Sequence, residues 1–201
     1  MNFFESKSMR PHQIDYRRFF SYFAIGACLA YYIATEKLGV GQYEFVAKIG
    51  LIATIATVTW VVFERHLWRW PIVRILAFID TPDLNGEWLG EARREGAPAP
   101  RPVTIRIRQT LTTLTLSTQG QVARTESVAA VLLKDIDRQY YIVNYWRGTA
   151  FDNLGNNKFE DFYGASRFQV LIEGGELVLE EHFFTNRNPP TKGLGWYKKS
   201  L

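Results

Sequence analysis

The stretch "DLNGEWLGE", residues 83–91, marks the point where the hydropathy pattern of this 201-residue chain changes. Long apolar runs precede it, whereas apolar and polar residues alternate after it, as in "VTIRIR" at 103–108. A period of two residues is typical of a half-buried β-strand. Gly86, Trp88 and Gly90 share one face of the first such strand, and glycines at such positions allow a bend and close backbone approach.

Eight strand-like segments follow one another between residues 84 and 201, and no helical period of useful length interrupts them. Gly174-Gly175 lies between two of them and suits a tight hairpin turn. Eight short antiparallel strands favour a small closed barrel, because closure removes exposed edges; a β-sandwich is the alternative. We expect the first and last strands to meet and the barrel to be closed by Gly86, Trp88, Gly90 and Trp196.

Two apolar runs without a charged residue precede the barrel, at 19–35 and 49–63. Both are near the lower length limit for a membrane-spanning helix, and buried core helices are the alternative. Aromatic residues near their ends and basic residues on their outer flanks are typical of a membrane hairpin. The expected fold is therefore two N-terminal transmembrane α-helices followed by an all-β, eight-stranded antiparallel minimal β-barrel, with both termini and the barrel in the cytoplasm.

The chain is expected to have four parts: a cytoplasmic leader (1–18), a transmembrane hairpin (19–63), a juxtamembrane amphipathic helix and linker (64–83) and the barrel (84–201). The amphipathic helix would begin at Pro71, since proline is favoured at the first helical position. Its apolar face, formed by Ile72, Ile75, Leu76 and Ile79, would lie on the membrane or pack on the barrel.

Several classes of function lack support in the sequence. The net charge of +4 is spread over the chain, unlike the concentrated basic face of proteins that bind DNA or RNA polymers. His12, His66 and His182 are scattered, so no metal site is predicted, and no phosphate-binding glycine motif is present. Glu180 and Glu181 point to opposite faces of a strand and are interpreted as solvated or capping carboxylates. We therefore expect no catalytic residues, no cofactor and no enzyme activity.

Two stretches carry recognition chemistry instead: "NYWRGTAFDN" (144–153) and "HFFTNRNPPTKG" (182–193). Arginine binds phosphate through its forked donors, and aromatic rings stack on bases. A barrel mouth that has both could hold a nucleotide. The alternative is an ordinary Asn/Pro/Gly turn together with core aromatic residues.

The segments "LNGEWLGE", "YWRGTA" and "FFTNRNPPTKG", arranged after two apolar runs, give the whole chain a recognisable pattern. The chain resembles the membrane-anchored β-barrel effectors of bacterial CBASS anti-phage systems. This resemblance implies a cytosolic barrel that binds a cyclic dinucleotide made by a cognate nucleotidyltransferase. It also implies homo-oligomerisation in the lipid of the inner membrane, membrane disruption and abortive infection.

The ligand contacts for such a cyclic dinucleotide are assigned from side-chain chemistry. Phosphate contacts are expected from Arg187 and Lys192, with Arg147 as a further candidate. Base stacking is expected from Tyr145 or Trp146, and hydrogen bonds from Thr185, Asn186 and Thr191.

Two other functions remain open. A tethered barrel that binds a lipid or fatty acid would need a continuous apolar cavity. An inner-membrane structural or assembly protein would use the small residues of the second apolar run for helix packing, namely Gly50, Ala53, Thr54, Ala56 and Thr57.

Overall fold

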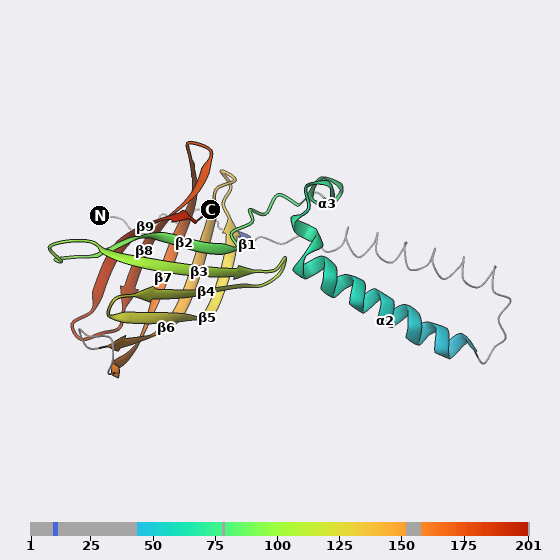
Figure 1. Cartoon of the computed structure of the whole chain (residues 1–201), viewed down its shortest axis with the longest axis horizontal. Helices are drawn as coiled ribbons and strands as arrows, with labels where there is room; N and C mark the ends of the chain where they lie inside the picture. The colour runs from blue at the N-terminus through green and yellow to red at the C-terminus, as the bar shows by residue number, and fades with distance from the viewer. Residues whose placement is uncertain (1–9, 12–43, 78, 152–157, 201) are drawn as a thin grey trace. The chain divides into compact units, whose positions relative to one another are not determined.

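The computed structural model describes residues 10–11, 44–77, 79–151 and 158–200 (Figure 1). The chain divides into two compact units. One unit consists of Met1–His12 and Asp83–Leu201, and the other consists of Gln13–Pro82.

The larger unit contains a closed barrel of eight antiparallel strands (Figure 1). Each strand pairs with the strands before and after it in the sequence, and the first and last strands pair with each other. The predicted barrel, and the predicted meeting of its first and last strands, are therefore confirmed. The strands are β2 (Gly86–Arg94), β3 (Arg101–Gln109), β4 (Leu114–Gly120), β5 (Ala123–Lys134), β6 (Tyr140–Phe151), β7 (Lys158–Glu173), β8 (Glu176–Thr185) and β9 (Thr191–Lys199).

The shortest pairing in the barrel joins β4 to β5, where only three residue pairs match Ser117–Gln119 with Arg124–Glu126. Beyond these pairs the Oγ of Ser127 accepts a hydrogen bond from the backbone N–H of Leu116, at 2.8 Å. Further along β5, the two-residue strand β1 (Arg10–Pro11) pairs with Leu133 and Lys134. A side chain and a short extra strand thus continue the ladder where β4 no longer pairs with β5.

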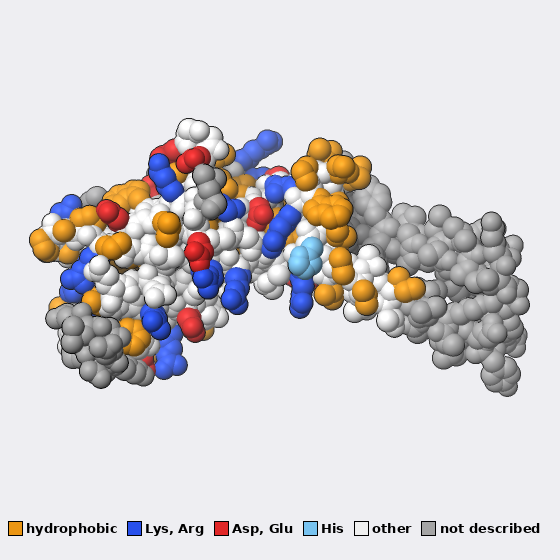
Figure 2. Space-filling view, viewed as in Figure 1, with side chains coloured by type: hydrophobic (Ala, Val, Ile, Leu, Met, Phe, Trp, Pro, Cys, Tyr) orange, Lys and Arg blue, Asp and Glu red, His pale blue; other side chains and the backbone are white. Residues whose placement is uncertain are grey.

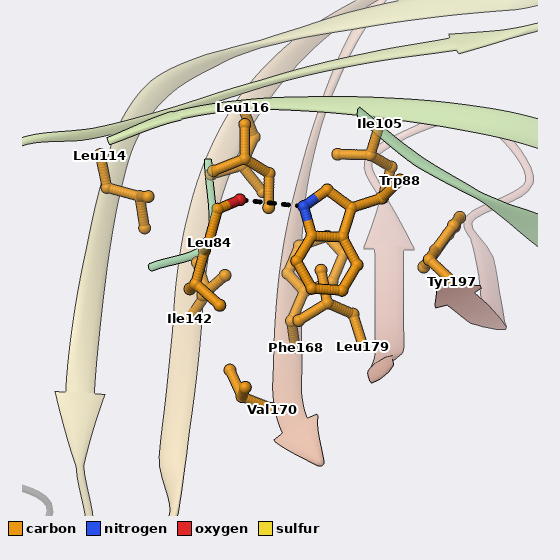
Figure 3. Close-up of a cluster of buried hydrophobic side chains, with 11 residues drawn as sticks. Leu84, Trp88, Ile105, Leu114, Leu116, Ile142, Phe168, Val170, Leu179 and Tyr197 are labelled. Carbon is orange, nitrogen blue, oxygen red and sulfur yellow. Dashed lines mark hydrogen bonds between the residues drawn. The ribbon is translucent and has the colours of Figure 1, made fainter. Parts of the chain in front are cut away.

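Alternate side chains point into the barrel, and in one half of it they form an apolar core (Figure 3). Trp88 lies in this core with no exposed surface, and its indole Nε1 donates a hydrogen bond to the carbonyl oxygen of Leu84 at 2.9 Å. Buried indole N–H groups need such a partner. The rest of this core consists of Leu84, Ile105, Ile107, Leu114, Leu116, Ile142, Phe168, Val170, Leu179 and Tyr197.

The stretch at 83–91 starts the barrel through its backbone as well as through Trp88. Leu84 N–H donates to Gln109 Oε1 at 2.8 Å, and Gln109 N–H donates to Asn85 Oδ1 at 2.7 Å. Gly86 has a φ of +126°, a conformation that residues with a side chain rarely adopt. A Cβ on Gly90 would lie 1.9 Å from the carbonyl oxygen of Trp196, so only glycine permits this approach of β2 to β9.

The smaller unit contains α2 (Glu44–Arg65), the 3₁₀ turn η1 (Leu67–Arg69) and α3 (Pro71–Leu76). The predicted start of the amphipathic helix at Pro71 is confirmed, but the helix ends at Leu76 and does not reach Ile79. Figure 2 shows hydrophobic side chains gathered over α3, where Ile72, Ile75 and Leu76 are each more than 70% exposed.

The prediction of two transmembrane helices is wrong. Among the residues that the structure describes, no helix is both long enough and apolar enough to cross a membrane. The uncharged run within α2, at 49–63, has fifteen residues, fewer than the roughly 20 that a bilayer core requires. The other run, at 19–35, lies outside the described residues.

The core position of Trp88 yields a stability prediction. Trp88→Ala removes a fully buried ring and should lower the free energy of unfolding by about 3–5 kcal/mol. The matched control is Leu89→Ala, whose side chain is 51% exposed on the outer face of the same strand and should cost about 0.5 kcal/mol or less. Urea denaturation of the full chain measures both values, and equal losses would contradict the assignment of Trp88 to the core.

Candidate functional site

A cavity of about 420 Å³ occupies the half of the barrel that the apolar core leaves free. Its lining includes the β2–β3, β4–β5 and β8–β9 connections, through Gly96, Gln121 and Arg187. In an up-and-down barrel these connections lie at the same end. The cavity therefore belongs to that end, and the core cluster lies beneath it.

The cavity exists because aromatic rings lie flat against glycines on the wall. Trp146 is directly opposite Gly164, and a Cβ at Gly164 would lie 2.3 Å from the indole ring. Phe162 is opposite Gly148 in the same way, and a Cβ at Gly148 would lie 2.6 Å from the Phe162 ring. Two more rings cover glycines of β9: Phe183 covers Gly193, and Tyr197 covers Gly195.

A buried carboxylate lies at the floor of the cavity. Glu181 is 8% exposed, and its two oxygens accept hydrogen bonds from Ser166 Oγ and Tyr197 OH, each at 2.6 Å. Ser166 Oγ in turn accepts a hydrogen bond from Trp146 Nε1 at 2.8 Å. The carboxylate is thus fixed by partners on the two neighbouring strands, β7 and β9, which restrict its rotation.

The same polar layer continues across β6 and β5. Asn144 is 3% exposed and lies opposite Ser166 in the β6–β7 pairing. Its Oδ1 accepts a hydrogen bond from Ser127 Oγ at 2.7 Å. Five neighbouring strands, β5 to β9, therefore each contribute one polar side chain to the floor.

Burial governs the ionisation of this floor. It raises the pKa of the Glu181 carboxyl above its usual value of about 4.5, and the hydrogen bonds from Ser166 and Tyr197 oppose that rise only in part. The pKa of the Tyr197 hydroxyl is raised as well, first by burial and then by the adjacent carboxylate. Tyr197 therefore stays protonated and acts as a donor to Glu181.

Arg187 lies among the cavity-lining residues, between a ring and a carboxylate. Its guanidinium carbon lies 4.0 Å above the Phe162 ring, and its Nε is 3.1 Å from Glu160 Oε2. The ion pair is close, yet within the described chain Nε lacks a hydrogen bond of acceptable geometry. The side chain is only 24% exposed, so a partly buried cation is held in place with donors still available.

Two further arginines, Arg94 and Arg101, also line the cavity. The acidic neighbour of Arg94, Glu95, is paired with Lys192, with 3.0 Å between Nζ and Oε2. Among the described residues neither Arg94 nor Arg101 has an ion-pair partner. Together with Arg187 they place three cations around the cavity, an arrangement suited to an anionic ligand.

Four of the residues predicted to bind a ligand line this cavity: Trp146, Thr185, Arg187 and Thr191. Thr185 and Thr191 are buried and hydrogen-bonded to each other, with 2.7 Å between their hydroxyl oxygens. Tyr145, Arg147, Asn186 and Lys192 are not in its lining.

The predicted ligand contacts that lie outside the cavity lining have other partners. Trp146 points inward, so its neighbours on β6 point outward: Tyr145 stacks on Tyr163 at 5.9 Å, and Arg147 pairs with Asp161 at 3.0 Å. Asn186 Oδ1 accepts a hydrogen bond from Tyr163 N–H at 2.7 Å. The prediction that placed all eight residues in one site therefore combined the two faces of the barrel wall.

Two other predictions are corrected at β8 and β9. Trp196, predicted to help close the barrel, is 47% exposed on the outer face, and Tyr197 takes the inward position. Glu181, interpreted as a solvated or capping carboxylate, is buried in the floor, whereas Glu180 lies outside near His182. The alternation of faces along a strand could have revealed the burial of Glu181, because Leu179 and Glu181 are two residues apart and must share one face of β8.

No protein-family model matches the chain, and no curated protein is significantly similar to it in sequence. The resemblance to CBASS effectors therefore rests on the residues quoted above. In the described part of the chain, no group of three or more His, Cys, Asp or Glu side chains is placed to hold a metal ion.

The raised pKa of Glu181 predicts a pH-dependent stability. The folded state disfavours the ionised carboxylate, so the stability associated with this group is complete below about pH 4.5 and is lost as the pH rises through the folded-state pKa. Between about pH 4.5 and the folded-state pKa of Glu181, the free energy of unfolding should fall by up to about 1.4 kcal/mol per pH unit because of this group.

Glu181→Gln should abolish this component, whereas Glu180→Gln should retain it because Glu180 is partly exposed. Urea denaturation of the full chain between pH 4 and 8 measures the difference between each variant and the parent. A parent and a Glu181→Gln variant that change in parallel with pH would contradict the assignment.

Proposed function

We propose that the barrel is a receptor for a cyclic dinucleotide, and that the protein acts as a ligand-controlled effector in bacterial anti-phage defence. The observation that carries this proposal is the composition of one cavity. It combines aromatic walls, a hydrogen-bonding floor and a set of three arginines in a volume of about 420 Å³. That volume is within the range of about 300–1,000 Å³ that is usual for small-molecule sites.

The arginines supply the chemistry for phosphate. A guanidinium binds two phosphate oxygens through parallel donors, a geometry that lysine does not offer. Arg187 is the strongest candidate because its side chain is partly buried and held against Phe162 before any ligand arrives. Pre-positioning lowers the entropy lost when the ligand binds.

The aromatic wall supplies the chemistry for a base. The indole N–H of Trp146 is already bonded to Ser166, so the ring can offer a ligand its face. Stacking of a base on an aromatic face contributes about 1–3 kcal/mol. A base lying against the face of Trp146 would leave the phosphates toward the arginines that line the same cavity.

The structure disfavours the lipid-binding alternative. A lipid-binding barrel needs an apolar cavity that continues through its interior, but the other half of this barrel is filled by Trp88, Phe168 and their neighbours. The remaining cavity ends on Glu181 and Asn144, and an acyl chain could not satisfy the hydrogen-bonding positions that these side chains leave open toward the cavity.

The output that we propose is self-association of the chain upon ligand binding. The smaller unit carries exposed apolar side chains on α3, including Ile72, Ile75 and Leu76. Exposed patches of this kind are typical of interaction surfaces. A ligand that favours their burial between copies would convert an infection signal into an assembly.

The phosphate role of Arg187 is tested by calorimetric titration of the full chain with a panel of cyclic dinucleotides. Arg187→Ala should weaken the tightest member about ten- to hundredfold, since a hydrogen bond to a charged group contributes about 1.5–3 kcal/mol. Arg147→Ala is the matched control, because it removes an arginine that is also paired with a carboxylate but lies on the outer face. Absence of saturable binding to every member of the panel would overturn the receptor function.

The proposed output is tested by light scattering on the same protein. A saturating cyclic dinucleotide should raise the molar mass above that of the ligand-free chain, and Ile75→Asp should prevent this rise without changing the affinity. Ile75 is 74% exposed, so the substitution should leave the fold intact. A molar mass unaffected by a bound ligand would refute self-association while leaving the receptor function in place.

A further inference from the structure

The floor of the cavity has hydrogen-bonding capacity that the protein itself does not use. An ionised carboxylate offers about four lone-pair positions. Ser166 and Tyr197 occupy one on each oxygen of Glu181. In the described chain the remaining positions have no donor, and Glu181 is among the cavity-lining residues. A ligand in the cavity therefore meets a buried acceptor of fixed orientation.

Asn144 provides a donor beside this acceptor. Ser127 Oγ accepts a hydrogen bond from Leu116 N–H, which leaves its own hydrogen to be donated to Asn144. The amide must then present its oxygen to Ser127, and this fixes the Nδ2 on the other side. Among the described residues Nδ2 has no hydrogen-bond partner, although Asn144 is 3% exposed and lines the cavity.

The pairing register brings the donor and the acceptor to the same part of the floor. Asn144 lies directly opposite Ser166, and Ser166 donates a hydrogen bond to Glu181. Ser166 thus lies between them, with the Trp146 indole bonded to its oxygen from the side of the wall. A planar group lying against Trp146 would lie in the same cavity as both polar side chains.

Nucleobases differ along their hydrogen-bonding edge. Guanine and uracil carry a ring N–H next to a carbonyl oxygen, whereas adenine and cytosine carry an unprotonated ring nitrogen next to an amino group. We propose that Glu181 and Asn144 form a base-reading subsite that accepts the ring N–H of guanine or uracil and donates to the adjacent carbonyl oxygen. This inference rests on the cyclic-dinucleotide function proposed above.

When Glu181 is ionised, the same subsite rejects adenine and cytosine. Their ring nitrogen would direct a lone pair at the Glu181 carboxylate, and the Asn144 amide would face an amino group. A site built to hydrogen-bond a particular group discriminates strongly against an analogue that leaves its buried polar atoms unpaired. A ring N–H also favours the charged carboxylate that burial alone disfavours, because hydrogen bonds to the charged form stabilise it.

The first experiment needs no substitution. The full chain is titrated calorimetrically with cyclic di-GMP, cyclic di-UMP, cyclic di-AMP and cyclic di-CMP at one ionic strength and at one alkaline pH, which favours the ionised form of Glu181. The first two should bind at least about tenfold more tightly than the last two, which corresponds to one hydrogen bond to a charged group.

The second experiment reverses the preference. Glu181→Gln keeps the size of the side chain but replaces one acceptor oxygen with an N–H donor, which suits the ring nitrogen of adenine or cytosine. The variant should lose about tenfold or more in affinity for the guanine and uracil ligands and gain relative preference for the other two. Glu180→Gln, one residue away on the outer face, should change neither affinity.

The outcomes separate this inference from the function on which it rests. If none of the four ligands binds the parent chain, the receptor function and the base-reading subsite both fail. Binding without a preference for guanine and uracil, or an equal loss for all four in a folded Glu181→Gln variant, would overturn the subsite and leave the receptor intact. If circular dichroism shows that Glu181→Gln does not fold, the parent panel alone decides.

Discussion

The width of an eight-stranded barrel constrains everything else in this unit. Such an interior has room for inward side chains and little more, so a cavity appears only where those side chains are small or lie flat. Here the inward glycines of β6, β7 and β9, namely Gly148, Gly164, Gly193 and Gly195, receive the rings of neighbouring residues. A ring pressed against the wall in this way covers the backbone while keeping the centre open. The same barrel therefore contains a packed core in one half and a binding cavity in the other.

The polar floor follows from the position of the boundary between these halves. A carboxylate placed deeper in the apolar core, beside Trp88, would lose its hydration with nothing to replace it. Glu181 occupies the next inward position of β8 after the core residue Leu179, and there Ser166 and Tyr197 donate hydrogen bonds to it. Two hydrogen bonds offset only part of the cost of desolvation, which is why the pKa of its carboxyl remains raised. A buried polar group that is incompletely satisfied in the protein is one that a ligand can satisfy.

Alternation along the strands made the barrel predictable, and the same alternation explains why the predicted ligand contacts lie on both faces of the barrel wall. The eight strands and the pairing of β2 with β9 follow from period-two patterns and turn residues that are visible in the chain. The ligand contacts were grouped by nearness in sequence, so Tyr145 and Arg147 were included with Trp146 although adjacent residues on a strand face opposite sides. Arg94 and Arg101 were missed because they reach the cavity only through barrel closure. The helical prediction was wrong for another reason: the uncharged run within α2 is shorter than the roughly 20 residues that a bilayer core requires.

Tyr197 connects the closure of the barrel to its cavity. Its ring packs in the core beside Phe168, at 6.3 Å between centroids, while its hydroxyl donates to Glu181 at the floor. Its backbone pairs with Gly90 of β2, where an added Cβ would lie 2.7 Å from the Tyr197 Cα. The glycine at 90 in "DLNGEWLGE" therefore does more than permit a bend. By letting β9 approach β2, it fixes the strand that carries Tyr197, and through Tyr197 it fixes the orientation of the carboxylate that faces the cavity. The segment that begins the barrel thus helps to position the residue that holds its buried acid, although more than a hundred residues separate them in sequence.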